Sequence, residues 1–122
     1  MTKVLYIEDN EDNIYMLKMR LEKKGFEVVI ARDGQAGLNA ALTVSPDIIL
    51  LDVGLPVLDG YQVAKKAKSD PKIAHIPIIM LTANALAEDR DKALKAGANE
   101  YEPKPVNMQN LLAKIEALAL KH

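Results

Sequence analysis

One segment constrains the fold of this chain more than any other: the apolar run Ile48–Leu51, which is followed directly by Asp52. Four consecutive apolar residues bounded by turn-forming segments are typical of a strand that is buried on both faces of a parallel sheet. Open sheets of this class bind their ligands beyond the carboxyl ends of the strands. We therefore expect the carboxylate of Asp52 at the edge of a sheet where a binding site forms.

Two other apolar runs end in the same way. Val4–Ile7 is followed by Glu8-Asp9, and Ile78–Leu81 is followed by Thr82. A short strand close to position 101 would bring Lys104 to the same edge. Acids, a hydroxyl and a lysine at neighbouring strand ends form a site suited to a divalent metal and a phosphoryl group.

The composition predicts one globular domain over residues 1–122. The chain is 49% hydrophobic and 27% charged, with a formal net charge of −1 and no cysteine. The balanced charge argues against nucleic acid as the main partner, because backbone binding needs a clustered basic surface. No apolar run approaches the roughly 20 residues of a membrane span, and the beginning of the chain has no signal-peptide layout. The absence of cysteine excludes disulfides and cysteine chemistry. Together, these observations lead us to expect a cytoplasmic protein without membrane attachment.

The hydrophobic pattern alternates strand and helix along the chain. The expected strands are Lys3–Ile7, Glu27–Ala31, Asp47–Leu51, Ile78–Thr82 and Asn99–Glu102, and the expected helices are Glu11–Lys24, Gln35–Val44, Tyr61–Ser69, Leu86–Ala96 and Met108–Leu120. Helical crossovers between parallel strands place helices on both faces of the sheet. The pattern predicts an α/β fold, a doubly wound, flavodoxin-like five-stranded parallel sheet with strand order 2-1-3-4-5.

Apolar residues at helical spacing indicate which helix faces are buried. The expected buried residues are Ile14, Leu17 and Leu21 in the first helix, Leu38, Ala41 and Leu42 in the second, Leu86, Ala93 and Leu94 in the fourth, and Leu111, Ile115 and Leu118 in the fifth. The fourth helix has the weakest pattern. Pro103 lacks a backbone donor, which predicts that the fifth strand lies at the edge of the sheet.

The order of these motifs resembles that of the response-regulator receiver domains of bacterial two-component signalling. The motifs that carry the resemblance are Glu8-Asp9, Asp52 with Pro56, Asp59-Gly60, Thr82-Ala83 and Lys104-Pro105. The resemblance covers essentially the whole chain and is to the stand-alone, single-domain kind. We expect a complete chain rather than a receiver excised from a hybrid kinase or a longer regulator.

The resemblance implies that Asp52 accepts a phosphoryl group and that Mg²⁺ is the cofactor. It implies that Asp9 and Asp52 bind the ion directly, that Glu8 binds mainly through water, and that Gly54 offers its backbone carbonyl. The chemistry agrees, because a carboxylate can attack phosphorus and Mg²⁺ prefers oxygen ligands.

These acids also have ordinary structural interpretations. Glu8 and Asp9 would cap the following helix, where carboxylates complement the dipole, and Asp52 would be a solvated aspartate at a strand end. Both roles of Glu8 and Asp9 can hold together. Asp52 without a cation, however, would crowd three carboxylates together, and like charges a few ångströms apart destabilise a fold. The metal and phosphoryl site is therefore the favoured interpretation.

The remaining implied roles concern the far side of the site. Thr82 would donate its hydroxyl to a phosphoryl oxygen, and Lys104, before a cis peptide bond to Pro105, would hold the phosphoryl group. Tyr101 stands where receivers place a switch aromatic; its alternative role is that of a half-buried tyrosine on an edge strand. The ring would turn inward as Thr82 moves, which changes the surface of the fourth helix, fifth strand and fifth helix.

Several residues mark departures or exclusions. Gly54 stands where receivers more often carry a larger side chain, and Asn84 is the other variable position beside the site, so the phosphate lifetime stays open. His75 and His122 have no partner at metal-ligand spacing and are expected at the surface. Ile14 stands where a calcium-binding EF-hand loop requires glycine.

The expected function is a phosphorylation-controlled switch for protein interaction. Its partners would be a histidine kinase or a histidine phosphotransfer protein, and it would be a monomer or a weak, phosphorylation-dependent dimer. It would catalyse its own phosphorylation and dephosphorylation without being a conventional enzyme. A dehalogenase-like phosphatase needs a second acid where Gly54 stands, and a flavodoxin-like carrier needs a phosphate loop where the acidic segment Glu8–Asp12 lies.

Overall fold

The strands form a single parallel sheet. The computed structural model describes residues 2–83 and 87–119. Its strands are β1 Lys3–Ile7, β2 Glu27–Ala31, β3 Ile48–Asp52, β4 Ile78–Thr82 and β5 Glu100–Pro103, in the order β2-β1-β3-β4-β5. Its helices are α1 Glu11–Lys23, α2 Gly34–Val44, α3 Gly60–Ser69, α4 Ala87–Ala96 and α5 Met108–Ala119. The predicted fold class and strand order are confirmed.

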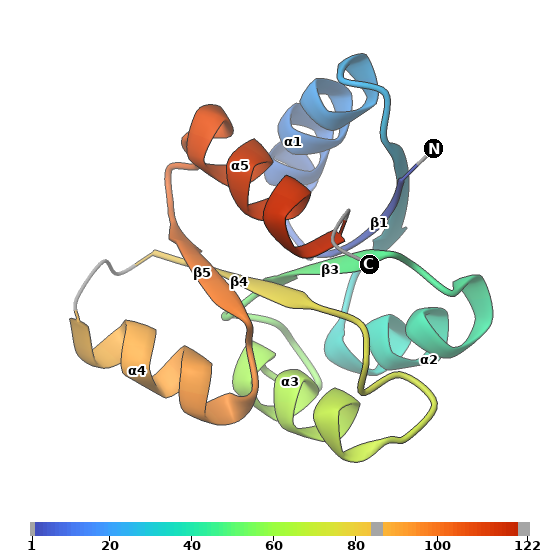
Figure 1. Ribbon diagram of the computed structural model, residues 1–122, viewed down its shortest axis with the longest axis vertical. Helices are drawn as coiled ribbons and strands as arrows, with labels where there is room; N and C mark the ends of the chain where they lie inside the picture. Colours follow the sequence, from blue (N-terminus) through green and yellow to red (C-terminus); the bar gives the residue numbers. More distant parts are fainter. Residues whose placement is uncertain (1, 84–86, 120–122) are drawn as a thin grey trace.

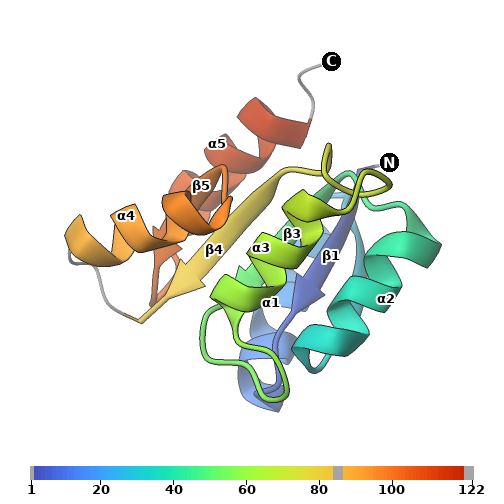
Figure 2. The same ribbon diagram turned by 90° about the horizontal axis from the view of Figure 1, so that it is seen from below.

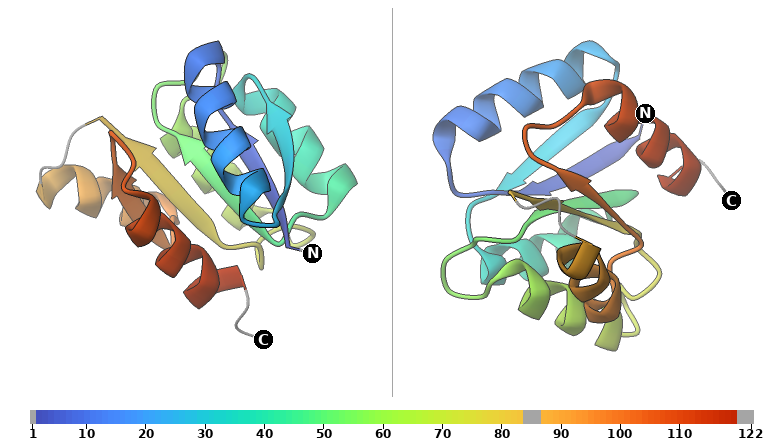
Figure 3. Two further views of the ribbon diagram at one scale, coloured as in Figure 1. Left: turned by 90° about the horizontal axis from the view of Figure 1, so that it is seen from above. Right: turned by 90° about the vertical axis from the view of Figure 1, so that its left-hand side faces the viewer.

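The helices cover both faces of the sheet. In Figure 1, α1 and α5 lie above the sheet and α2, α3 and α4 lie below it, and the left view of Figure 3 looks onto α1 and α5 from above. Residues along a strand point alternately to the two faces. On β1, Val4 and Tyr6 therefore pack with α1 and α5, whereas Leu5 and Ile7 pack with α2 and α3.

All carboxyl ends of the strands meet at one edge of the sheet. Figure 2 shows the arrowheads of β1, β3 and β4 pointing to the same side. The register pairs Ile7 with Leu51 and Asp52 with Leu81. The residues that follow β1 therefore lie beside the end of β3, although about forty positions separate them in the sequence.

The buried face of α2 differs from the prediction. Ala41 is buried as predicted, but Leu38 is only half-buried and Leu42 is 44% exposed, whereas Gly34 and Gly37 are buried. A Cβ atom on Gly37 would lie 2.4 Å from Cδ1 of Ile7, so the helix approaches β1 through its small residues. That approach turns the helix so that Leu42 points away from the core, a result that apolar spacing alone does not indicate.

The other helix faces are closer to expectation. The predicted core residues of α1 are buried, as are Ala93, Leu111 and Ile115. Leu118 is half-buried, and Leu94 is 37% exposed, so its predicted burial is wrong. The predicted first residue of the fourth helix, Leu86, lies outside the described residues.

Several boundaries moved by one residue. β5 begins at Glu100 and includes Pro103, and it lies at the edge of the sheet as predicted. Helix α3 begins at Gly60, because Asp59 caps it by accepting a hydrogen bond from the backbone of Gln62. His75 is exposed, as expected, and His122 lies outside the described residues. None of the described helices is long and apolar enough to cross a membrane.

Candidate functional site

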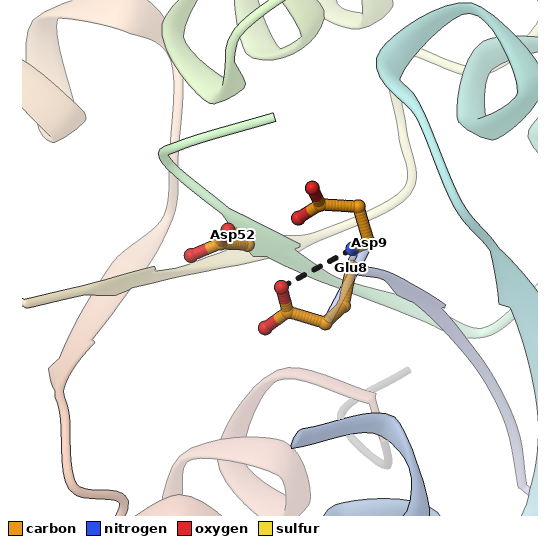
Figure 4. A group of neighbouring side chains, drawn as sticks. All are labelled: Glu8, Asp9 and Asp52. Carbon is orange, nitrogen blue, oxygen red and sulfur yellow. Dashed lines mark hydrogen bonds between the residues drawn. The ribbon is translucent and has the colours of Figure 1, made fainter. Parts of the chain in front are cut away.

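Three carboxylates meet where β1 and β3 end. Glu8, Asp9 and Asp52 each offer an oxygen atom, and these atoms all lie within 4.8 Å of one another (Figure 4). Glu8 and Asp52 are buried, whereas Asp9 is exposed. The parallel register of β1 and β3 brings the two strand ends side by side, so the acids that the sequence placed at strand ends form one cluster.

Lys104 reaches this cluster from the end of β5. Its Nζ donates to Oδ1 of Asp52 at 2.6 Å and to Oε1 of Glu8 at 3.3 Å. Burial alone would lower the pKa of Lys104, but the hydrogen bonds and charges of Asp52 and Glu8 outweigh it and raise the pKa. The peptide bond between Lys104 and Pro105 is cis, as the family resemblance implies.

Glu8 is held by more groups than the sequence indicated. Its Oε2 accepts from the backbone amides of Asp9 at 3.2 Å and Asn10 at 3.3 Å. Its Oε1 accepts from the hydroxyl of Tyr6 at 3.3 Å and from Nδ2 of Asn13 at 3.4 Å, besides Lys104. Sequence reasoning missed Tyr6 and Asn13. The alternation of β1 was the available signal for Tyr6, because residues two apart share a face.

The first turn of α1 is capped by another residue. Asn10 is the N-cap, and its side chain accepts a hydrogen bond from the backbone of Asn13 at 2.9 Å. Asn10 is therefore the N-cap of α1 in place of Glu8 or Asp9, although both acids still lie next to the positive end of the helix dipole.

The backbone around Asp52 is fixed on one side and open on the other. A Cβ atom on Gly60 would lie 2.6 Å from the carbonyl oxygen of Asp52, so only glycine lets α3 begin this close to the end of β3. On the other side, Gly54 is exposed, and a Cβ there would contact only Oδ2 of Asp52, at 3.9 Å. The space beside Oδ2 is therefore open to an approaching group.

Thr82 and Tyr101 lie on the neighbouring strands. Thr82 is buried at the end of β4, and its carbonyl oxygen accepts from the backbone of Lys104 at 2.7 Å. Tyr101 is half-buried on β5. Its ring centre lies 6.0 Å from the guanidinium of Arg90 on α4 and 5.5 Å from Nζ of Lys114 on α5. Asn84 lies outside the described residues.

The donor set fits Mg²⁺. The cluster offers three carboxylates and only one lysine among the described side chains that contact them, so negative charge is in excess. Hard oxygen ligands are the ones that Mg²⁺ takes, commonly one or two carboxylates with several waters. The site can therefore hold a divalent cation and, beside it, an anion that Lys104 would bind.

A cavity opens next to the lysine. It has a volume of about 280 Å³ and lies between α1 and the loop that follows β5. Its walls include Tyr6, Asn13, Met16, Arg20 and Lys104. The exposed surface of α1 continues this wall with apolar side chains, since Met16 is among the large hydrophobic residues left in solvent.

Comparison with known proteins assigns the chain to a family. Residues 4–116 match the response regulator receiver domain, and the chain belongs to this family. Receiver domains are phosphorylation switches of two-component signalling, are generally not conventional enzymes, and interact with histidine kinases or phosphotransfer proteins. They generally bind Mg²⁺ at an acidic pocket, and this chain has an acidic cluster at the corresponding edge of its sheet.

Individual relatives support the assignment. The chain is 38% identical over 116 residues to the response regulator PleD of Caulobacter vibrioides. The matched segment is 95% of this chain but only 26% of PleD. It is 35% identical over 118 residues to the polar-differentiation response regulator DivK of Brucella ovis, covering 96% of both chains. The receiver domain of the sensor histidine kinase PA1611 from Pseudomonas aeruginosa has a TM-score of 0.91 at 34% identity, covering 98% of both chains. That structure holds a magnesium ion in its active-site cleft.

Proposed function

We propose that this chain, as one receiver domain over residues 1–122, accepts a phosphoryl group on Asp52 and signals by a change of its surface. The observation that carries the proposal is the contact between Nζ of Lys104 and Oδ1 of Asp52, at 2.6 Å, inside the cluster formed with Glu8 and Asp9. A nucleophilic carboxylate beside a lysine and a cation site is what phosphoryl transfer requires, because positioning and charge neutralisation supply most of its catalysis.

The reaction transfers phosphorus from nitrogen to oxygen. An oxygen of Asp52 attacks the phosphorus of a phosphohistidine in line with the bond from phosphorus to the imidazole nitrogen. The new bond joins phosphorus to the carboxylate oxygen, and the imidazole leaves with the electron pair of the broken bond. The open space beside Gly54 admits the donor. Later attack by water releases inorganic phosphate and restores the Asp52 carboxylate.

The cofactor of this reaction is proposed to be Mg²⁺. Asp9 and Asp52 would bind it directly, Glu8 mainly through water, and Gly54 through its backbone carbonyl. When bound, the ion neutralises charge on the phosphoryl oxygens. Lys104 would leave Asp52 and donate to a phosphoryl oxygen, and Thr82 would donate its hydroxyl to another.

The signal is proposed to leave the site through Tyr101. Movement of Thr82 toward the phosphoryl group would open space into which the ring of Tyr101 turns. The surrounding helices would follow, because Arg90 of α4 and Lys114 of α5 both lie against this ring. The surface of α4, β5 and α5 would then bind a downstream protein.

The partners are proposed to be a histidine kinase or a histidine phosphotransfer protein. The cavity beside Lys104 and the apolar residues of α1 offer a docking surface next to the nucleophile. We further propose a cytoplasmic protein that binds neither nucleic acid nor membrane, and a monomer that dimerises weakly, if at all, when phosphorylated. Light scattering with and without acetyl phosphate would test the dimer.

The primary test is the intact mass of the protein after incubation with acetyl phosphate. We expect a gain of one phosphoryl group that depends on Mg²⁺ and is absent from Asp52→Asn. Asp59→Asn is a matched control, because it makes the same change at an exposed carboxylate that only caps α3. A phosphoryl mass gain that persists in Asp52→Asn would contradict the proposal. So would a wild-type protein that gains no phosphoryl group from either acetyl phosphate or phosphorylated kinases.

The switch has its own test. The chain contains no tryptophan, so Tyr101→Trp introduces a single tryptophan, whose emission can be excited apart from that of the tyrosines. We expect its emission to change on phosphorylation in the presence of Mg²⁺, because the ring moves to a less exposed environment. The same protein with Asp52→Asn should show no change, and unchanged emission in a fully phosphorylated sample would contradict the proposed path.

A further inference from the structure

Glu8 is the most completely hydrogen-bonded carboxylate of the site. Its side chain is 2% exposed, and its two oxygens accept from the donors described above, two backbone amides on Oε2 and three side chains on Oε1. The amides belong to the backbone and stay in place whatever happens at the site. The side-chain donors on Oε1 are therefore the ones whose arrangement can change.

Lys104 is the donor that has to leave. Its contact with Asp52 at 2.6 Å is much shorter than its contact with Glu8 at 3.3 Å, so Asp52 dominates its position before phosphorylation. In the proposed function, Lys104 follows the new phosphoryl group and moves away from both carboxylates. A buried carboxylate that loses a charged donor is destabilised strongly unless other donors remain.

Tyr6 can stay hydrogen-bonded to Glu8 when Lys104 moves away. It points to the same face of β1 as Glu8, and it is only 2% exposed because α1 and α5 pack over it. Its hydroxyl donates to Oε1 at 3.3 Å. A tyrosine hydroxyl carries its proton at neutral pH, so Tyr6 stays a donor to Glu8.

The hydroxyl of Tyr6 is a polar group in an otherwise apolar core. The other buried residues of this core cluster are aliphatic, and phenylalanine would fill the space of Tyr6 without burying a polar atom. Asn13 also donates to Oε1, but it is exposed, so water can replace it. Tyr6 is the side-chain donor on Oε1 that neither moves with the phosphoryl group nor exchanges with solvent.

We infer that Tyr6 is a positioning residue for phosphoryl transfer. Its hydroxyl holds the carboxylate of Glu8 toward the cation site and keeps Oε1 hydrogen-bonded while Lys104 transfers to the phosphoryl group. This inference rests on the proposed function. It adds a residue that touches neither the phosphoryl group nor the metal and acts through Glu8.

The test compares Tyr6→Phe with wild type and with Tyr15→Phe. Tyr15 is 66% exposed on α1, so Tyr15→Phe removes the same atom where it contacts none of these groups. Three quantities are measured: the dissociation constant for Mg²⁺ from backbone amide shifts without phosphoryl donor, the phosphorylation rate with acetyl phosphate at saturating Mg²⁺, and the urea midpoint without Mg²⁺. For Tyr6→Phe we expect a weaker Mg²⁺ affinity and a rate lowered by about 10-fold, as for other residues that orient metal ligands.

Asn13→Ala is the second variant, because its exposed position cannot prevent folding. We expect its rate to fall by only about 2–3-fold, since water replaces the amide. Should Tyr6→Phe not fold, the rate of Asn13→Ala decides the question, because Tyr6 still donates to Oε1 in that variant. A fall of about 10-fold or more in Asn13→Ala would overturn the inference, since Asn13 and not Tyr6 would then hold Glu8.

The inference is overturned when folded Tyr6→Phe phosphorylates at saturating Mg²⁺ within about twofold of wild type, because Tyr6 is then only a core residue. A lower urea midpoint with an unchanged rate has the same meaning. The proposed function fails separately: wild type and Tyr15→Phe would then both lack Mg²⁺ binding or phosphorylation.

Discussion

Two lysines in the described part of the chain pair with buried carboxylates, and the two regions differ in charge balance rather than in burial. Lys114 on α5 donates to Oε1 of Glu102 at 2.7 Å and to the carbonyl oxygen of Tyr101 at 2.6 Å. Lys104 donates to carboxylates that belong to a cluster of three. The two lysine side chains are almost equally exposed, at 26% and 25%.

The comparison separates a structural ion pair from a functional one. In the Glu102 region one lysine meets one acid, and the lysine also satisfies a backbone carbonyl, so its charges are balanced within the described structure. In the region around Asp52 the negative charges outnumber the positive one. An excess of buried charge is unfavourable without a ligand, which makes this cluster the place for a cation.

The largest expected effect comes from breaking the balanced pair. Lys114→Met leaves Glu102 buried without a counter-charge, so we expect the free energy of unfolding to fall by about 3 kcal/mol. Urea unfolding followed by circular dichroism measures it. The double variant Glu102→Leu with Lys114→Met should regain most of the loss, because both charges are then removed. If the free energy of unfolding of Lys114→Met fell only slightly, the ion pair between Lys114 and Glu102 would be solvated.

Addition of Mg²⁺ is expected to stabilise the protein. At a free concentration ten times its dissociation constant, the ion should raise the free energy of unfolding by about 1.4 kcal/mol, because it binds only the folded cluster. The measurement is urea unfolding at increasing MgCl₂, with NaCl at equal ionic strength as the control. Lys114→Met should show the same stabilisation by Mg²⁺ as wild type. If Mg²⁺ no longer stabilised Lys114→Met, the two regions would not be independent.

Removal of one acid sharpens the contrast. Asp9 is exposed and has no ion pair in the described part of the chain, so Asp9→Asn removes mainly repulsion from Glu8 and Asp52. Without Mg²⁺ we expect stability to rise by about 1 kcal/mol, and the gain from Mg²⁺ should disappear. Asp12→Asn, an exposed acid in the first turn of α1, is the control and should do neither.

The smallest expected effect concerns the open side of the cluster. A methyl group at Gly54 meets only Oδ2 of Asp52 at 3.9 Å, so Gly54→Ala should change stability by about 0.5 kcal/mol, in the stabilising direction. The added group covers the approach to the phosphoryl group, so we expect slower hydrolysis of the phosphorylated protein, followed by intact mass over time. Faster hydrolysis would show that this side does not admit the attacking water.

Much of the site was predictable because strand ends in a parallel sheet converge. The apolar runs located β1, β3 and β4. The acids that follow the first two runs now lie together, and Thr82 ends the neighbouring β4. The incorrect burial predictions concern how a helix packs on the sheet. Leu42 was predicted to be buried from its spacing, but glycine and alanine residues bring α2 onto β1 and leave Leu42 in solvent.

The sequence by itself determined the fold class, the strand order and the candidate residues at the strand ends, because these depend on local periodicity and on general rules of chain connection. The tertiary structure alone decided which groups touch. Lys104 and Glu8 are 96 positions apart, and Glu102 finds Lys114 on another element. Such contacts depend on register, helix rotation and distances of a few ångströms, and no local pattern of residue types encodes them.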